Sequence, residues 1–140
     1  MSYSTLIHER GFQNDTENCI ENLQNICHGL SKEAGWWGPH AQQAIGVASP
    51  TDQDIAEKLL LIHCEISEAV EGRRKNLQDD HLPHRKMFDV ELADVAIRLF
   101  DLAGAMRVDL AGSMVEKMEY NTQRKDHKPE NRELEGGKKF

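Results

Sequence analysis

The sequence has few of the residues that mark secreted or membrane proteins. It has three cysteines, Cys19, Cys27 and Cys64, an odd number without a Cys-x-x-Cys pair. This count does not predict a disulfide framework, and we expect three free thiols in a reducing cytoplasm. The longest apolar run, Leu59–Ile62, is far shorter than a membrane span. No apolar stretch near the start resembles a secretion signal, so we expect a cytoplasmic protein without a membrane partner.

Basic residues are also too few for a nucleic-acid-binding surface. The chain has 17 Lys and Arg against 24 Asp and Glu, and a net charge of −7. A protein that binds nucleic acid needs a basic patch, so this balance excludes nucleic acid as a main partner. An acidic chain is compatible with a cation site, and with a nucleotide that arrives already bound to its metal.

Strand-like alternation of useful length is missing, and helical periodicity takes its place. Apolar residues recur every three or four positions in four segments, at about 16–34, 50–75, 84–105 and 110–124. The second segment has a helix-start signal at Ser49-Pro50, and Gly104 with Asp109 brackets a turn before the fourth. We therefore predict an all-α fold, a four-helix bundle. The 140 residues suit one domain, with residues 1–14 as a flexible lead-in, 15–125 as the helical domain and 126–140 as a polar tail.

Two carboxylate pairs interrupt the most apolar helical segments. Glu65 and Glu68 lie in the second segment, and Glu91 and Asp94 in the third. Residues three apart share a helix face, so each pair directs two carboxylates the same way. If the two helices are antiparallel neighbours, four acids converge and repel, and a hard cation such as Mg²⁺ removes that conflict. Ion pairs at the edge of the core are the alternative, since acid-x-x-acid spacing is common in so acidic a chain.

Cationic residues lie where they would contact phosphate. Arg98 lies one turn beyond Asp94, and Asp101 follows three residues later. The functional interpretation makes Arg98 a phosphate contact and Asp101 an acid that supports the metal ligands; the alternative is a local salt bridge of Arg98 with Asp94 or Asp101. On the fourth segment a second set shares one face: Lys117, Asn121 and Arg124. These suit triphosphate oxygens, or form an ordinary solvated helix end.

Aromatic residues make up only 6% of the chain, yet two tryptophans are adjacent. Trp36 and Trp37 follow the first helical segment in a glycine-flanked loop, and His28 precedes them. Paired tryptophans can stack on a base, and the histidine can hydrogen-bond to it. The alternatives are that the tryptophans cap the core and that His28 is a surface residue.

The combined motif resembles a known family. Glu65-Ile-Ser-Glu68, 22 further residues and Glu91-Leu-Ala-Asp94 resemble the signature of the all-α nucleoside triphosphate pyrophosphohydrolases. This superfamily includes MazG, dimeric dUTPase and dCTP pyrophosphatase. The segment Lys117–Arg124, KMEYNTQR, is similar to the family's Lys-x-x-x-Asn-x-x-Arg segment. The resemblance covers roughly residues 20–128, most of the chain.

The resemblance implies an enzyme that hydrolyses a (d)NTP to the monophosphate and pyrophosphate, with Mg²⁺ as cofactor or Mn²⁺ in its place. It assigns metal binding and catalysis to the four acids, Glu65, Glu68, Glu91 and Asp94. It assigns phosphate and nucleotide contacts to Lys117, Asn121 and Arg124, and a base pocket to His28 and Trp37. It also implies a homodimer or homotetramer, a role in cleaning the nucleotide pool, and a lean toward pyrimidine deoxynucleotides such as dCTP.

Two other classes of function fit the same segments. A catalytically inactive helical module would use the fold to sense nucleotides or to bind proteins, and a purely structural adaptor would not respond to Mg²⁺. A complete set of acids and cations argues against an inactive module, because a degenerate site is expected to have lost some of them.

Overall fold

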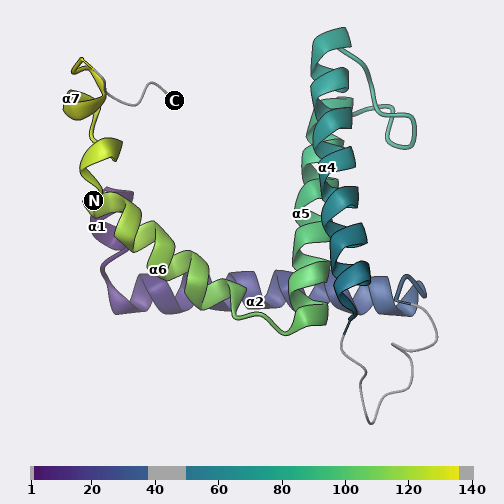
Figure 1. Ribbon diagram of the computed structural model, residues 1–140, viewed down its shortest axis with the longest axis horizontal. Helices are drawn as coiled ribbons and strands as arrows, with labels where there is room; N and C mark the ends of the chain where they lie inside the picture. Colours follow the sequence, from purple (N-terminus) through teal and green to yellow (C-terminus); the bar gives the residue numbers. More distant parts are fainter. Residues whose placement is uncertain (1, 38–49, 136–140) are drawn as a thin grey trace. The chain divides into compact units, whose positions relative to one another are not determined.

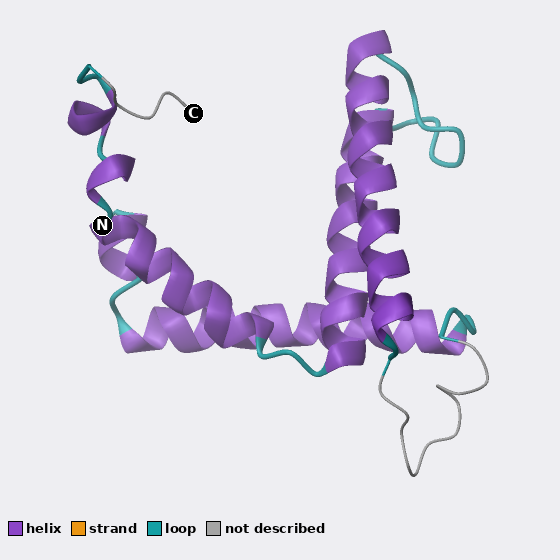
Figure 2. Cartoon of the chain, in the orientation of Figure 1, coloured by secondary structure: helices purple, strands orange, loops and turns teal. Residues whose placement is uncertain are grey.

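The computed structural model describes residues 2–37 and 50–135, and this part of the chain is helical (Figures 1 and 2). The main helices are α2 (Arg10–Glu33), α4 (Asp52–Lys75), α5 (Met87–Met106) and α6 (Leu110–Gln123). Three shorter elements flank them, α1 (Tyr3–Leu6), the 3₁₀ helix η1 (Lys125–His127) and α7 (Pro129–Arg132). No strand occurs within the described ranges, so the prediction of an all-α fold is confirmed.

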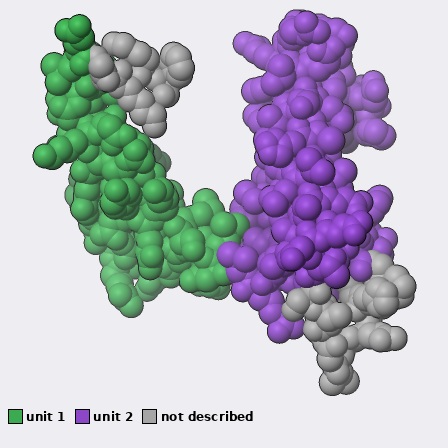
Figure 3. Space-filling model, viewed as in Figure 1, with its two compact units in different colours: residues 1–22, 109–140 green, residues 23–108 purple. Residues whose placement is uncertain are grey.

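The chain forms two compact units (Figure 3). One contains residues 1–22 and 109–140, and the other contains residues 23–108. Within the predicted lead-in, residues 1–14, the structure contains α1 and the start of α2. In the described residues, only α4 and α5 form an extensive helix pair.

Helix α4 has well-defined signals at both ends. Thr51 is its N-cap, and a capping box joins the Thr51 and Asp54 side chains to each other's backbone N–H groups. The predicted start at Ser49-Pro50 is therefore displaced, and Ser49 itself lies outside the described residues. The helix ends at Asn76, which adopts a left-handed conformation with φ 53°.

A short, hydrogen-bonded loop returns the chain from α4 to α5. Asp79 is buried and accepts hydrogen bonds from the backbone N–H groups of His81 and Leu82, at 3.0 and 2.6 Å. At the loop's base α4 and α5 approach closely, because a Cβ at Gly72 would lie only 2.9 Å from Met87 Cβ. The loop therefore makes α4 and α5 antiparallel neighbours, as predicted and as Figure 1 shows.

Gly104 has a different role from the one its sequence position suggests. The turn that it was predicted to bracket begins later, because α5 continues to Met106 and is capped by Arg107 at φ 52°. Gly104 is a point of close approach to α2: a Cβ there would lie 2.5 Å from His28 Cβ and 3.3 Å from the Gln24 carbonyl oxygen. Glycine is needed here for space.

Many apolar side chains are exposed, whereas a four-helix bundle within one chain would cover them. The α4 surface that faces α5 includes buried Glu65, Ala69 and Gly72. The periodic apolar positions are only partly covered: Ala69 and Leu102 are buried. Others are exposed, and we call these the apolar stripe of the α4–α5 pair: Leu59, Ile66, Val70, Leu92 and Leu99. Within the described ranges, no helix has the length and apolar character needed to cross a membrane.

The unit formed by the two ends of the chain is held by a small core and a polar contact. Ile7, Ile20, Ala111 and Val115 are buried. His8 Nδ1 lies 2.9 Å from Glu119 Oε1, and its Nε2 lies 3.2 Å from Thr122 Oγ1. These contacts join the start of the chain to α6.

Candidate metal and nucleotide site

Three of the four predicted metal ligands lie together. One carboxylate oxygen from each of Glu65, Glu91 and Asp94 lies within 4.8 Å of the other two. Glu65 comes from α4, whereas Glu91 and Asp94 come from α5. Glu65 and Glu91 are only 7% and 6% exposed. The antiparallel pairing therefore produces an acid cluster (Glu65, Glu91 and Asp94) from residues far apart in the sequence.

The acid cluster has the electrostatics expected of crowded carboxylates. Burial raises the pKa of Glu91 from 4.5 to about 7, assisted by a hydrogen bond with Glu65 and by repulsion from Glu68. Burial also raises the pKa of Asp94, and the negative charge of Glu65 adds to the effect. Near neutral pH Glu91 is therefore partly protonated, and a cation that binds this carboxylate would displace its proton.

Glu68 lies outside this three-acid group and is exposed. It remains close enough to raise the pKa of Glu91 by repulsion. The sequence prediction of four converging acids thus corresponds to three clustered carboxylates with a fourth acid nearby.

Arg98 provides positive charge to the acid cluster. Its Nε lies 2.7 Å from Glu65 Oε1, although the angles are too poor for a hydrogen bond and Nε has no other partner in the described residues. Arg98 also opposes the rise in the pKa of Asp94. The alternative of a local salt bridge with Asp94 or Asp101 is therefore replaced by an ion pair to the neighbouring helix.

Asp101 belongs to a second cluster. It is buried, and its carboxylate accepts hydrogen bonds from Trp37 Nε1 at 2.7 Å and Ser31 Oγ at 2.8 Å, while His28 Nδ1 lies 2.9 Å away. In the described residues the hydrogen bonds of Asp101 are with His28, Ser31 and Trp37, so it joins neither the acid cluster nor Arg98, the two alternatives that the sequence left open. We call Asp101, His28, Ser31 and Trp37 the Asp101 cluster.

The two tryptophans have different surroundings. Trp37 is half-buried, lies edge-on to His28 with ring centroids 5.8 Å apart, and carries the Lys58 ammonium 4.5 Å from its ring centroid. Trp36 is 73% exposed. The structure thus brings His28 and Trp37 together and leaves Trp36 apart from them.

The predicted phosphate-binding residues on α6 have local partners. Lys117 Nζ lies 4.8 Å from the Tyr120 ring centroid, and Arg124 pairs with Asp126. The buried side-chain oxygen of Asn121 has no hydrogen-bond partner in the described part of the chain. These residues belong to the unit made by the chain ends, and their role in phosphate binding stays a prediction.

Three residues that contact or act on members of these clusters were not predicted from the sequence. Ser31 and Lys58 complete the surroundings of Trp37, and the Asp79 charge acts on Asp94. Only Asp79 had a sequence signal, an aspartate in a loop ahead of Pro83, which is typical of a side chain that caps a turn. Ser31 and Lys58 had none.

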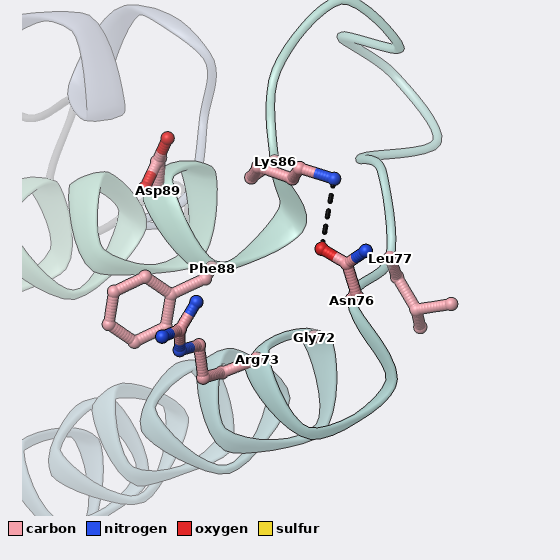
Figure 4. Close-up of a pocket in the computed structure, with 7 residues that line it drawn as sticks. All are labelled: Gly72, Arg73, Asn76, Leu77, Lys86, Phe88 and Asp89. Carbon is pink, nitrogen blue, oxygen red and sulfur yellow. Dashed lines mark hydrogen bonds between the residues drawn. The ribbon is translucent and has the colours of Figure 1, made fainter.

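A small pocket of about 70 Å³ lies elsewhere, at the loop end of the α4–α5 pair (Figure 4). Gly72, Arg73, Asn76, Leu77, Lys86, Phe88 and Asp89 line it. In Figure 4 the Lys86 ammonium donates a hydrogen bond across the pocket to the Asn76 side-chain oxygen, at 3.0 Å. None of the predicted site residues lines this pocket.

Comparisons with known proteins do not identify the chain. No protein-family model, curated protein or solved structure matches it. The assignment of function therefore depends on the residues and their geometry.

Proposed function

We propose that this chain is a Mg²⁺-dependent nucleoside triphosphate pyrophosphohydrolase of the MazG type. The observation that carries the proposal is the convergence of Glu65, Glu91 and Asp94 from two helices, with their carboxylate oxygens within 4.8 Å. A donor set made only of carboxylates suits a hard cation, Mg²⁺ or Mn²⁺. Burial first, and then its acidic neighbours, raise the pKa of Glu91. This rise reflects the free-energy cost of ionising Glu91 in the cluster, and a bound cation would lower that cost.

Glu65, Glu91 and Asp94 would hold the metal. When bound, Mg²⁺ would neutralise charge that develops on the phosphate oxygens during attack by water. Glu68, which is exposed and acts electrostatically on Glu91, would accept a proton from the attacking water. Arg98 would exchange its contact with Glu65 for a phosphate oxygen, a role that suits the planar guanidinium.

The nucleoside would lie against the Asp101 cluster. Asp94 and Asp101 are seven residues apart on α5, a separation of about two helical turns or ~10.5 Å on one side of the helix. His28 and Trp37 would contact the base there. The resemblance associates Lys117, Asn121 and Arg124 with phosphate and nucleotide contacts, and it favours pyrimidine deoxynucleotides such as dCTP.

We propose in addition that the enzyme is a homodimer or a dimer of dimers. The support is the exposed apolar stripe of the α4–α5 pair, which includes Ile66 at 42% and Val70 at 60% exposure. A four-helix bundle then forms from the α4–α5 pairs of two copies.

The test is a screen of the common NTPs and dNTPs with Mg²⁺, with pyrophosphate release as the readout. We expect release with at least one nucleotide, and loss of at least about a hundredfold in Glu65→Gln, since the metal ligand is removed. The matched control is Glu57→Gln, an exposed acid on the same helix. A wild-type protein that releases no pyrophosphate from any triphosphate would contradict the proposal and favour the inactive sensing module.

A further inference from the structure

We infer that Asp101 is a positioning residue that fixes the tautomer and orientation of His28, and the orientation of Trp37, so that one ring nitrogen of His28 is presented to a planar ligand. The juxtaposition that carries this inference is the approach of three donor groups to one buried carboxylate. The identity of the ligand rests on the proposed function, whereas the positioning itself does not.

The Asp101 carboxylate decides which ring nitrogen of His28 carries a proton. An ionised carboxylate only accepts hydrogen bonds, so the His28 Nδ1 that lies 2.9 Å from Asp101 Oδ1 must carry a proton. In a neutral imidazole the other nitrogen, Nε2, is then an acceptor. His28 Nε2 has no hydrogen-bond partner in the described residues, and the side chain is 22% exposed. Nε2 is therefore the atom of this ring that remains for a ligand.

The same carboxylate also fixes the orientation of the Trp37 ring. Its indole N–H donates to the same Asp101 oxygen that faces His28, at 2.7 Å. The shared acceptor sets the two rings edge-on, with their planes at 74°. Lys58 lies over the Trp37 ring, which adds a cation–π contact to the hydrogen bond. The orientation of Trp37 is thus fixed by contacts from three separate parts of the chain.

The backbone that carries His28 is packed closely against α5 at Gly104. The close approach at Gly104 brings α2 onto α5 where His28 is attached, because the missing Cβ would lie 2.5 Å from His28 Cβ. Packing therefore fixes the base of the side chain, and Asp101 fixes its ring. A residue held at both ends gives a preformed contact, and a preformed contact lowers the entropic cost of binding.

Asp101→Leu tests this inference, because it removes the acceptor of the Nδ1 proton and adds no donor or acceptor. Asp101→Asn would not do so, since its amide oxygen could still accept from both Trp37 Nε1 and His28 Nδ1, which share one Asp101 oxygen. In Asp101→Leu nothing holds the His28 proton at Nδ1, so Nε2 can carry it and change from acceptor to donor. Nitrogen-15 NMR of the imidazole reports the tautomer directly in full-length protein without nucleotide. We expect the Nδ1–H tautomer in the wild type, the Nε2–H tautomer in Asp101→Leu, and no change in the control Ser31→Ala. A wild-type protein with the Nε2–H tautomer would overturn the inference even if Asp101→Leu does not fold.

Base preference provides a second readout that a merely structural role would not move. Cytosine offers an amino donor where uracil has a carbonyl acceptor. We expect the ratio of kcat/KM for dCTP over dUTP to fall about tenfold in Asp101→Leu, the effect of one hydrogen bond of reversed sense, while kcat changes little. An unchanged ratio with an unchanged tautomer would overturn the inference and leave the proposed function intact. If the wild type hydrolyses no triphosphate, the NMR result still decides the role of Asp101.

Discussion

Arg98 on α5 and Glu65 on α4 form an ion pair across the helix pair, with Nε 2.7 Å from Oε1. Glu65 is buried, whereas the Arg98 side chain is 41% exposed. The guanidinium thus reaches from the surface to partly neutralise an acid cluster that has too much negative charge. A cation that binds to Glu65 would compete with this contact, which couples Arg98 to the state of the cluster.

Replacement of Arg98 tests that coupling. In Arg98→Met the carboxylates lose a positive neighbour, so we expect the metal-free protein to lose about 1 kcal/mol of stability at alkaline pH, a modest value because Arg98 is partly exposed. Added Mg²⁺ should restore more stability in the variant than in the wild type. Chemical denaturation with and without Mg²⁺ measures both effects, and Arg73→Met, an exposed arginine on α4, is the control. Equal gains from Mg²⁺ in all three proteins would contradict the coupling.

The raised pKa of Glu91 predicts an unusual dependence of stability on pH. Burial, followed by its acidic neighbours, raises this pKa from 4.5 to about 7 in the folded chain. As pH rises through this interval, the unfolded chain loses a proton that the folded chain keeps, so stability falls and stays low above pH 7. Mg²⁺ needs the ionised group, so its stabilising effect should grow over the same interval.

Thermal melts across this pH range, with and without Mg²⁺, measure both trends. In Glu91→Gln the fall in melting temperature should largely disappear. A wild-type protein whose metal-free stability rises from pH 4.5 to pH 7 would contradict the account of Glu91.

Gly104 provides a test of the packing beneath His28. Gly104→Ala places a methyl group against His28 and the Gln24 carbonyl oxygen, and we expect a loss of about 1–3 kcal/mol from overpacking. Gly29→Ala is the matched control, because the Cβ it would add to α2 meets nothing within 4 Å beyond its chain neighbours and the helix's own backbone. That variant should gain up to about 1 kcal/mol from helix propensity. Equal effects of the two substitutions on the free energy of unfolding would count against the close approach.

Self-association should depend on the apolar stripe of α4. Light scattering is expected to give a dimer or tetramer for the wild type and smaller species for Ile66→Lys, because a charge in an apolar interface is costly. Glu57→Lys changes an exposed residue on the opposite side of α4 and should leave the assembly unchanged. A monomeric wild type would contradict the proposed bundle of two copies.

The sequence was enough to predict much of the secondary structure, but not the surroundings of many side chains. Periodicity predicted the four main helices and the face shared within each acid pair. Periodicity does not say what covers a face, so it could not show that Glu68 stays exposed beside the acid cluster, or that Ile66 and Val70 are exposed in this chain. It left Asp101 either with the metal ligands or in a salt bridge with Arg98, because neighbours on α5 were visible and His28 on α2 was not. Gly104 was predicted to bracket a turn for the same reason, since its contact lies on another helix.

The most direct test of the central claim is the Mg²⁺ dependence of pyrophosphate release by Glu91→Gln, with Glu57→Gln as control. We predict that Glu57→Gln follows the wild type, whereas Glu91→Gln loses at least about a hundredfold in rate at every Mg²⁺ concentration and keeps its helical content. Wild-type turnover by Glu91→Gln would show that the acid cluster is not the site of the reaction.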